Sequence, residues 1–296
     1  MSSKPRLRRL FSPKIIAVIG GGVWCRSVIE QLLKMDYQGK IFPVHPFKKE
    51  ILGLKYFKDL EEIPAKIDAS FVGVNRNITI EVIKKLNDLN AGGAVCFASG
   101  FLEAEDDKQG SGKLQKSLIE AAGDMPILGP NCYGFINYLD RSVLWPDQHG
   151  GKAVDRGVAI LTQSSNLAIN ITMQTRGLPI SYIMSVGNQA SLGFSEIGMY
   201  LLSDPRVTAL GLHIEGIGDV RAFEELATKA RKLGKSIVVL KVGKSAAACK
   251  AAQSHTASLA GNAQGAKSLF KRLGISEVDR LEVLLDTLKI FHLNGQ

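Results

Sequence analysis

Ile15-Ile16-Ala17-Val18-Ile19-Gly20-Gly21-Gly22-Val23-Trp24-Cys25 is a short β-branched run that passes directly into a glycine-rich loop, and a helical pattern follows. A buried strand, a glycine loop and a helix in this order are typical of the start of a doubly wound α/β domain. The loop almost matches the pattern GxGxxG, but Cys25 stands at the third glycine position. The match alone is a weak signal, because a purely structural tight turn has the same sequence.

Apolar runs and helical stretches alternate through the first half of the chain. The predicted strands are Ile15–Ile19, Ile41–His45, Ser70–Val74, Ala94–Ala98 and Met125–Leu128, and the predicted helices are Val28–Met35, Ile78–Leu89 and Gly112–Ala122. This order predicts an α/β fold with a parallel sheet and right-handed crossovers. We therefore expect a Rossmann-like domain over residues 1–150, which ends in a polar, glycine-rich stretch.

The same alternation restarts in the second half. The predicted strands are Gly157–Leu161, Tyr182–Val186, Ala209–Ile214, Ser236–Val242 and Ser276–Val278, and the predicted helices are Asn166–Thr175, Phe194–Leu202, Ala222–Leu233, Ala263–Leu273 and Leu281–His292. This predicts a second, flavodoxin-like domain over residues 151–296, again with a parallel sheet.

The composition fits a folded protein of two domains. The chain has 296 residues, of which 45% are hydrophobic and 22% charged, which is too apolar for a disordered protein. Its apolar runs are far shorter than the roughly 20 residues of a membrane helix, and the run after the N-terminus is too short for a signal peptide. Its cysteines form no CxxC pair and no cluster with histidine, which predicts reduced thiols, a cytoplasmic protein and no metal site.

A net charge of +9 favours anionic ligands. The charge is dispersed, so nucleic acid is not an expected partner. After the second strand, Val44-His45-Pro46-Phe47-Lys48-Lys49 lacks the carboxylate that binds the ribose of NAD. Lys48 and Lys49 instead suit a phosphate on the ribose, as in NADP or in the 3′-phosphate of coenzyme A. The alternative is that these lysines merely solvate a loop.

Three further loops follow strands of the first domain. They are Asn75-Arg76-Asn77, Ser99-Gly100-Phe101 and Gly129-Pro130-Asn131-Cys132-Tyr133-Gly134. Loops at the carboxyl ends of parallel strands converge, so we expect them to line a ligand site. For Asn131, the alternative is that its side chain only caps a turn.

The second domain contains two segments with possible chemistry. Ser164 and Ser165 follow a strand and open a helix, where free backbone N–H groups bind anions, although a plain serine N-cap has the same pattern. His255 lies among small residues in Gln253-Ser254-His255-Thr256-Ala257-Ser258. A lone histidine is more often structural than catalytic, but His45, His149, His213 and His292 have less suggestive surroundings.

Several ordered motifs together resemble the NDP-forming acyl-CoA synthetase family, which is related to the succinyl-CoA synthetase alpha subunit. They span almost the whole chain and comprise the opening Leu10–Gly20, Gly129-Pro130-Asn131-Cys132, Gln163-Ser164-Ser165, Ser185-Val186-Gly187-Asn188, Glu215-Gly216-Ile217 and Ser254-His255-Thr256. The chain departs from the family pattern at Gly21-Gly22, at Asn166 and at Ser191. The last two positions lie near the expected phosphoryl and acyl site, so the identity of the acid stays open.

The resemblance implies a role for each motif. Coenzyme A would bind to the first domain through Gly20, Gly21, Gly22, Lys48, Lys49, Asn75, Ser99 and Asn131. His255 would carry the phosphoryl group, Glu215 would orient its ring, and the helix start at Ser164 and Ser165 would bind the phosphoryl oxygens. The reaction would pass from phosphohistidine to an acyl phosphate, which the coenzyme A thiol would attack.

The resemblance also implies missing parts. The family binds ATP, with Mg, in an ATP-grasp unit, and only a predicted helix, strand and helix follow His255. A partner subunit or a C-terminal continuation would supply that unit, and we expect an oligomer that acts on a small carboxylic acid. Two other hypotheses remain open: a non-catalytic module that senses coenzyme A or acyl-CoA, and an NADP-dependent oxidoreductase.

Overall fold

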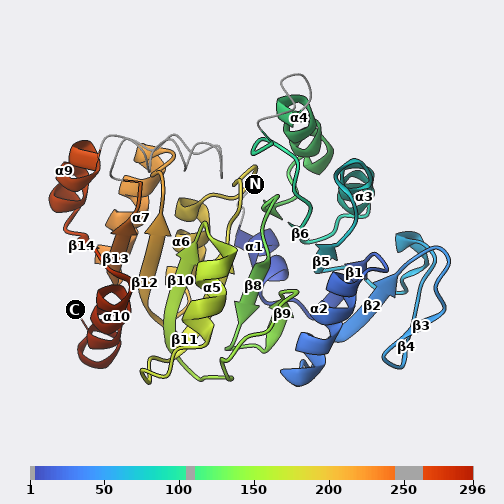
Figure 1. The fold of residues 1–296 in the computed structure, drawn as a ribbon, viewed down its shortest axis with the longest axis horizontal. Coiled ribbons are helices and arrows are strands. Elements are labelled where there is room, and N and C mark those ends of the chain that lie inside the picture. The colour runs from blue at the N-terminus through green and yellow to red at the C-terminus, as the bar shows by residue number, and fades with distance from the viewer. Residues whose placement is uncertain (1–3, 105–110, 244–262, 296) are drawn as a thin grey trace.

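The computed structural model describes residues 4–104, 111–243 and 263–295, which form two α/β units side by side (Figure 1). The first unit has a parallel five-stranded sheet in the order β2-β1-β5-β6-β7. Its strands are β1 (Ile15–Ile19), β2 (Lys40–Val44), β5 (Ala69–Val72), β6 (Ala94–Cys96) and β7 (Ile127–Leu128). The predicted parallel sheet of the first domain is thereby confirmed.

Helices cover both faces of this first sheet. They are α2 (Val23–Lys34) on one face, and α3 (Arg76–Asp88) and α4 (Ser111–Ala122) on the other. A small hairpin of β3 (Glu50–Ile51) and β4 (Leu54–Lys55), then a 3₁₀ turn, η1 (Leu60–Glu62), lie between β2 and β5. The sequence pattern did not predict the hairpin, because its strands are too short to show a period.

The second unit has a seven-stranded sheet in the order β14-β13-β12-β10-β11-β8-β9. Its strands are β8 (Gly134–Asn137), β9 (Ser142–Leu144), β10 (Gly157–Thr162), β11 (Ile180–Ser185), β12 (Val207–Ile214), β13 (Ser236–Lys241) and β14 (Ser276–Val278). Its helices are α5 (Ser165–Thr172), α6 (Phe194–Leu202), α7 (Val220–Lys232), α9 (Ala263–Leu273) and α10 (Leu281–Asn294).

The predicted parallel sheet of the second domain is confirmed from β10 to β14, and the edge beyond β11 is antiparallel. β8 pairs antiparallel with β11 and with β9, whereas β10 to β14 are parallel. A tight turn links β8 to β9, and a two-strand hairpin can only be antiparallel. Both strands precede residue 150, so the second sheet begins earlier in the chain than the expected domain limit, which itself stays a prediction.

A short N-terminal helix, α1 (Lys4–Phe11), connects the two units. Arg9 pairs with Asp68 of the first unit at 2.9 Å, and the Asn137 side chain of β8 donates to the Phe11 carbonyl oxygen at 2.9 Å. The Phe11 ring is fully buried against Phe135, with ring centroids 5.3 Å apart. One hydrophobic core therefore runs from α1 and α2 into the second sheet.

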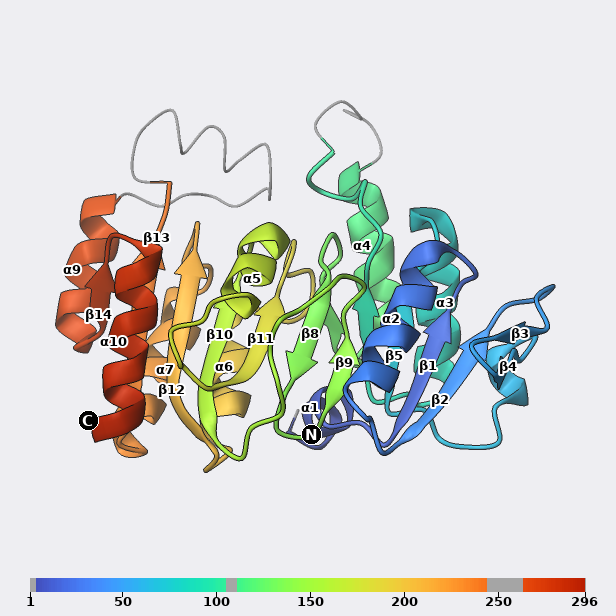
Figure 2. The ribbon, with the colours of Figure 1, turned by 60° about the horizontal axis from the view of Figure 1, so that its bottom comes forward.

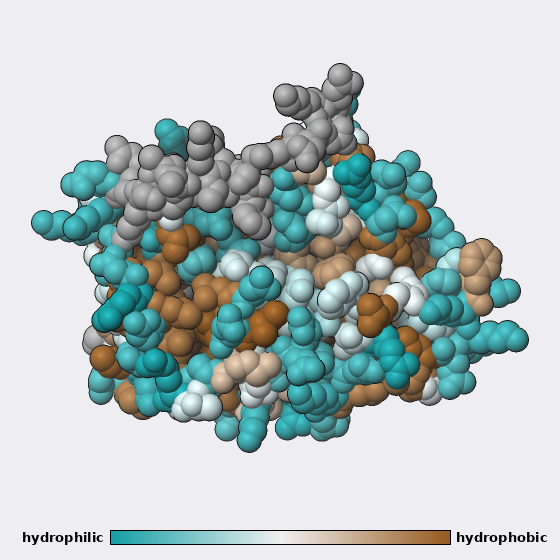
Figure 3. Space-filling model, viewed as in Figure 1, coloured by the Kyte–Doolittle hydropathy of each residue, from teal (hydrophilic) through white to brown (hydrophobic). Residues whose placement is uncertain are grey.

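The strand directions place the loops of both units on one side. In Figure 2 the arrowheads of β1, β10 and β12 point the same way, so the carboxyl ends of the two sheets share one edge of the molecule. Figure 3 shows hydrophilic residues around much of the outline and hydrophobic residues exposed between them. Within the described ranges, no helix is long and apolar enough to cross a membrane.

We expect Phe11→Ala to lower the free energy of unfolding by about 3–5 kcal/mol, because it leaves a cavity where both units meet. Phe47→Ala is the matched control, since the Phe47 side chain is 88% exposed and its loss should cost no more than about 0.5 kcal/mol. Urea denaturation of the three proteins measures both values. Equal stability losses would show that α1 does not tie the units together.

Candidate functional site

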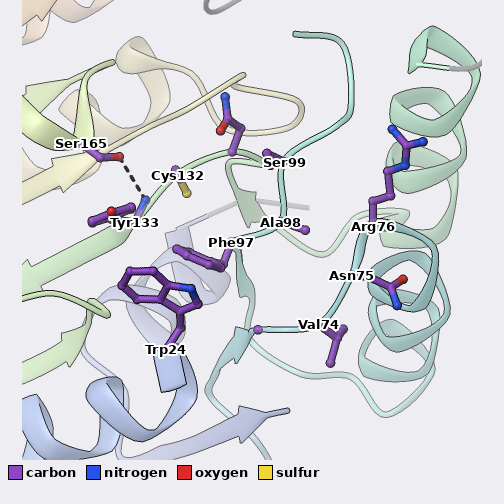
Figure 4. Close-up of a pocket in the computed structure, with 12 residues that line it drawn as sticks. Trp24, Val74, Asn75, Arg76, Phe97, Ala98, Ser99, Cys132, Tyr133 and Ser165 are labelled. Atoms are coloured by element: carbon purple, nitrogen blue, oxygen red, sulfur yellow. Dashed lines mark hydrogen bonds between the residues drawn. The ribbon is translucent and has the colours of Figure 1, made fainter. Parts of the chain in front are cut away.

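The first sheet has a topological switch point between β1 and β5. The chain leaves β1 toward β2 on one side and leaves β5 toward β6 on the other, so the two loops diverge and open a crevice. A pocket of about 560 Å³ occupies this place (Figure 4). Its lining comes from the loops after β5, β6 and β7 and from the starts of α2, α3 and α5: Trp24, Gly73, Val74, Asn75, Arg76, Phe97, Ala98, Ser99, Asn131, Cys132, Tyr133 and Ser165.

The backbone requires glycine at the first two of the three positions after β1, each for a different reason, and leaves the third free. Gly20 has φ +126°, and a Cβ there would lie 2.6 Å from the Gly73 carbonyl oxygen. A Cβ on Gly21 would lie 2.4 Å from the His45 ring. Gly22 has open space around it and is the N-cap of α2, with no side-chain cap. The first two positions therefore require glycine, and backbone N–H groups of the α2 start remain available to an anion.

Cys25 replaces the third glycine without disturbing the loop. Its Sγ lies 3.4 Å from the Ile19 carbonyl oxygen, and it fills the space between Gly20 and Gly73. Burial raises the pKa of this thiol to about 11, so it stays protonated at neutral pH and is no nucleophile.

Lys48 reaches back to the glycine loop. Its Nζ donates to the Gly21 carbonyl oxygen at 2.5 Å. The His45 Nδ1 accepts from the backbone N–H groups of Phe47 and Lys48, both at 3.2 Å, and burial, then the Lys48 charge, lowers the His45 pKa. The His45 side chain thus fixes the turn that presents Lys48. Lys49 is exposed beside it.

The three polar residues predicted on the other loops all line the pocket. The Asn75 Oδ1 accepts from the N–H groups of Asn77 and Ile78, both at 3.1 Å, so it caps α3. Asn131 has φ +57°, and its N–H donates to the Ala98 carbonyl oxygen at 2.9 Å. Its side chain makes no hydrogen bond to the described residues and does not cap a turn. Ser99 is exposed at the pocket.

The second sheet has its own switch point between β10 and β12. The Ser164 Oγ accepts from the Leu167 N–H at 3.2 Å and caps α5, as the plain N-cap interpretation predicted. The Ser165 Oγ instead exchanges a hydrogen bond with the Ser185 Oγ at 2.7 Å and lines the pocket. The Gln163 Oε1 accepts from the Glu215 N–H at 2.6 Å, which joins the ends of the two strands.

Glu215 is held at this switch point by its backbone. The Lys241 Nζ donates to its carbonyl oxygen at 2.6 Å, and its side chain is half-buried. Behind it, the His213 Nδ1 shares a hydrogen bond of 3.0 Å with the Thr162 Oγ1, and burial lowers the His213 pKa to about 4. His213 is therefore a neutral strand residue.

The two switch points share one wall. The Tyr133 N–H, from the loop after β7, donates to the Ser165 Oγ at 3.3 Å. The Asn188 N–H donates to the Pro130 carbonyl oxygen at 3.0 Å, and the Asn188 side chain donates to Glu103. The Gly129–Gly134 loop thus belongs to the pocket and to the domain contact at once.

His255, with Ser254 and Thr256, lies outside the described residues, so its expected role stays a prediction. Arg76 and Tyr133 lie in the loops that were expected to line a ligand site, although neither was singled out as a site residue. Trp24 and Phe97 also line the pocket, and no role was predicted for them. Arg76 donates to the Gly100 carbonyl oxygen at 2.7 Å. Within the described ranges, no three His, Cys, Asp or Glu side chains group as a metal site.

Comparison with known proteins decides the family. Residues 14–138 match the model of a CoA binding domain, and residues 155–291 match that of a succinyl-CoA ligase like flavodoxin domain. The alpha subunit of ADP-forming acetate–CoA ligase II from Pyrococcus furiosus is 32% identical over 95% of this chain. The chain belongs to the NDP-forming acyl-CoA synthetase family.

Other members of the synthetase family agree. A trans-feruloyl-CoA synthase from an unknown prokaryotic organism is 32% identical over 97% of the chain. The solved acetyl-coenzyme A synthetase 1 of Ca. Korarchaeum cryptofilum, in complex with phosphate and ADP, superposes with a TM-score of 0.83 at 30% identity over 95% of the chain. The chain spans 62%, 42% and 61%, respectively, of the lengths of these three proteins.

Gly187 lets the second sheet approach the Gly129–Gly134 loop closely in this member of the synthetase family. It has φ +55°, and a Cβ there would lie 2.2 Å from the Pro130 carbonyl oxygen, whereas Gly218, with φ +70°, has nothing within 4 Å. Gly218→Ala should lower the free energy of unfolding by about 1–2 kcal/mol, the cost of alanine in the left-handed region. Gly187→Ala should cost about 1–3 kcal/mol more, because it also clashes. Chemical denaturation compares the two variants, and identical losses would contradict a tight contact at Pro130.

Proposed function

We propose that this chain is the CoA-binding and phosphohistidine part of an acyl-CoA synthetase that converts ATP, a carboxylic acid and coenzyme A into acyl-CoA, ADP and phosphate. The observation that carries the proposal is the contact between Tyr133 and Ser165. It brings the pocket of the CoA-binding domain against the helix start that suits a phosphoryl group. Acyl transfer to a thiol needs both reactants at one place.

The first domain offers a cradle for the phosphates of coenzyme A. Backbone N–H groups at the start of α2 and the Lys48 ammonium lie on either side of Gly21, and both favour a phosphate. The neighbouring pocket begins at Gly73, which lies against Gly20, and is also lined by Ser99, Asn131 and Ser165. An extended ligand bound there would have its phosphates at the glycine loop and its thiol at the second domain.

The second domain would carry the phosphoryl transfer. His255 would attack the γ-phosphorus of ATP and release ADP, and a carboxylate oxygen of the acid would then take the phosphoryl group and release the histidine. The coenzyme A thiol, losing its proton, would attack the resulting acyl phosphate and expel phosphate. Glu215, held at the end of β12 by Gln163 and Lys241, would accept a hydrogen bond from the His255 ring and fix its tautomer.

The proposed reaction also needs a site for the nucleotide. We propose an ATP-grasp unit, with Mg, as a partner subunit or as a continuation of the polypeptide, because the chain spans 62% of a related alpha subunit and 42% of a related trans-feruloyl-CoA synthase. The acid stays open, since one of these relatives is named for acetate and the other for trans-ferulate. Oligomerisation and a cytoplasmic location remain predictions from the sequence.

Lys48→Ala should weaken coenzyme A binding by about 1–2 kcal/mol, because a charge-assisted phosphate contact is lost at an exposed site. Lys49→Ala should act in the same direction. For dephospho-coenzyme A, which lacks the 3′-phosphate, the loss should shrink. Isothermal titration calorimetry measures both ligands, with Lys55→Ala in β4 as a control that removes a lysine from the neighbouring hairpin. If the Lys48 and Lys49 variants bind both ligands like the unmodified protein, the lysine assignment is wrong.

His255→Ala should abolish phosphorylation of the chain when ATP and an ATP-grasp unit are supplied, while leaving coenzyme A affinity nearly unchanged. Glu215→Gln should keep the nucleophile and slow its phosphorylation by about 10²–10⁴-fold, because the orienting charge is lost. Mass spectrometry should locate the label on His255, and the label should be acid-labile and base-stable. Labelling of the alanine variant, or a label that survives acid, would refute the mechanism and favour a regulatory module.

A further inference from the structure

One wall of the pocket is aromatic. The rings of Trp24, at the start of α2, and of Phe97 and Tyr133, in the loops after β6 and β7, form a cluster. Their centroids are 5.5 Å apart for Trp24 and Phe97, 5.8 Å for Phe97 and Tyr133, and 6.2 Å for Trp24 and Tyr133. Figure 4 shows these side chains together on one side of the pocket, with Asn75 and Arg76 on the other.

This wall is rigid and open to the pocket. Tyr133 packs edge-to-face on the fully buried Trp145, with centroids 5.3 Å apart. Trp24 is 41% exposed, although an indole usually gains by burial. The three rings contact one another and leave apolar surface exposed to the pocket. A flat apolar group of a ligand could stack on this surface.

The position of the wall indicates which part of a ligand it meets. At one end of the wall, the backbone N–H of Tyr133 donates to the Ser165 Oγ. The proposed function places the phosphoryl group, and therefore the acyl carbon, at Ser165. The opposite wall, with Asn75, Arg76 and Ser99, offers the polar groups that phosphates and amides need. Neither an acetyl methyl group nor the thin pantetheine chain would cover three rings, and a pocket of about 560 Å³ has room for a larger group.

We propose that Trp24, Phe97 and Tyr133 form an acyl subsite, and that the substrate of this chain is an aromatic carboxylic acid whose ring stacks on this wall. The inference rests on the proposed function, because it takes the coenzyme A site and the acyl position from it. It adds the substrate class, which the fold and the CoA-binding loops leave open.

Calorimetry of the full chain with cinnamoyl-CoA, acetyl-CoA and free coenzyme A tests the subsite in the absence of turnover. We expect cinnamoyl-CoA to bind about tenfold more tightly than acetyl-CoA, the scale of one to two aromatic contacts. Trp24→Leu keeps an apolar side chain but removes the flat face. It should bring this ratio close to one while changing acetyl-CoA affinity less than about twofold, and Phe97→Leu should act in the same direction.

Trp145→Phe is the conservative comparison, since it keeps an aromatic ring beneath Tyr133 and lies outside the pocket lining. It should keep the tenfold ratio. The chain has only two tryptophans, so this variant also leaves Trp24 as the sole indole emitter. Cinnamoyl-CoA should then change its fluorescence more than acetyl-CoA does.

The outcomes separate the two proposals. Equal binding of cinnamoyl-CoA and acetyl-CoA by the unmodified chain would overturn the aromatic subsite and leave the coenzyme A site intact. If Trp24→Leu weakens the binding of both thioesters by the same factor, the wall contacts pantetheine rather than the acyl group. That result would also overturn the aromatic subsite. Failure of all three ligands to bind would overturn the coenzyme A site and, with it, the subsite.

Discussion

The contact between the Gly129–Gly134 loop and the second sheet is the constraint on which the rest of the site depends. The Pro130 carbonyl oxygen accepts from the Asn188 N–H, and the Tyr133 N–H donates to the Ser165 Oγ. Each sheet alone has a switch point that could hold a ligand. Only this contact makes the two switch points adjacent, so that one pocket has walls from both units. Gly187 permits it, because a side chain there would meet Pro130.

The chemistry follows from what each wall offers. The glycine loop and Lys48 present N–H groups and positive charge, which suit phosphates. Ser165 and the fixed backbone of Glu215 lie at the other end, in the second domain. Separate sites in one pocket allow a long ligand such as coenzyme A to be held at its phosphates while its thiol reacts elsewhere. The proposed aromatic wall adjoins the Ser165 end through Tyr133 and sets which acid is accepted.

The sequence predicted the elements that have a strong local period and missed those that lack one. The bounds of α6 and β14 agree with the predicted Phe194–Leu202 and Ser276–Val278. Helix α1 was missed because its basic residues hide the buried stripe of Leu7, Leu10 and Phe11. Strands β8 and β9 are too short to show an alternation, and their antiparallel pairing depends on a distant partner, β11.

Site residues in recognisable motifs were predicted, and those that only the fold brings together were not. Residues in loops with a recognisable motif, such as Gly21, Asn131 and Ser165, were expected at a ligand site and lie at the pocket or beside it. Asn75 was also expected there, but its side-chain oxygen caps a helix. Trp24, Phe97 and Tyr133 come from one helix start and two loops that are far apart in the sequence, and no local pattern joins them before the chain folds.

The most direct test of the shared pocket is a crystal structure of this chain with coenzyme A. The phosphates should lie at Gly20–Gly22 beside Lys48, and the sulfur should lie at the Tyr133 and Ser165 end of the pocket. A sulfur that points away from the second domain, or coenzyme A bound outside this pocket, would contradict a single site built from both units.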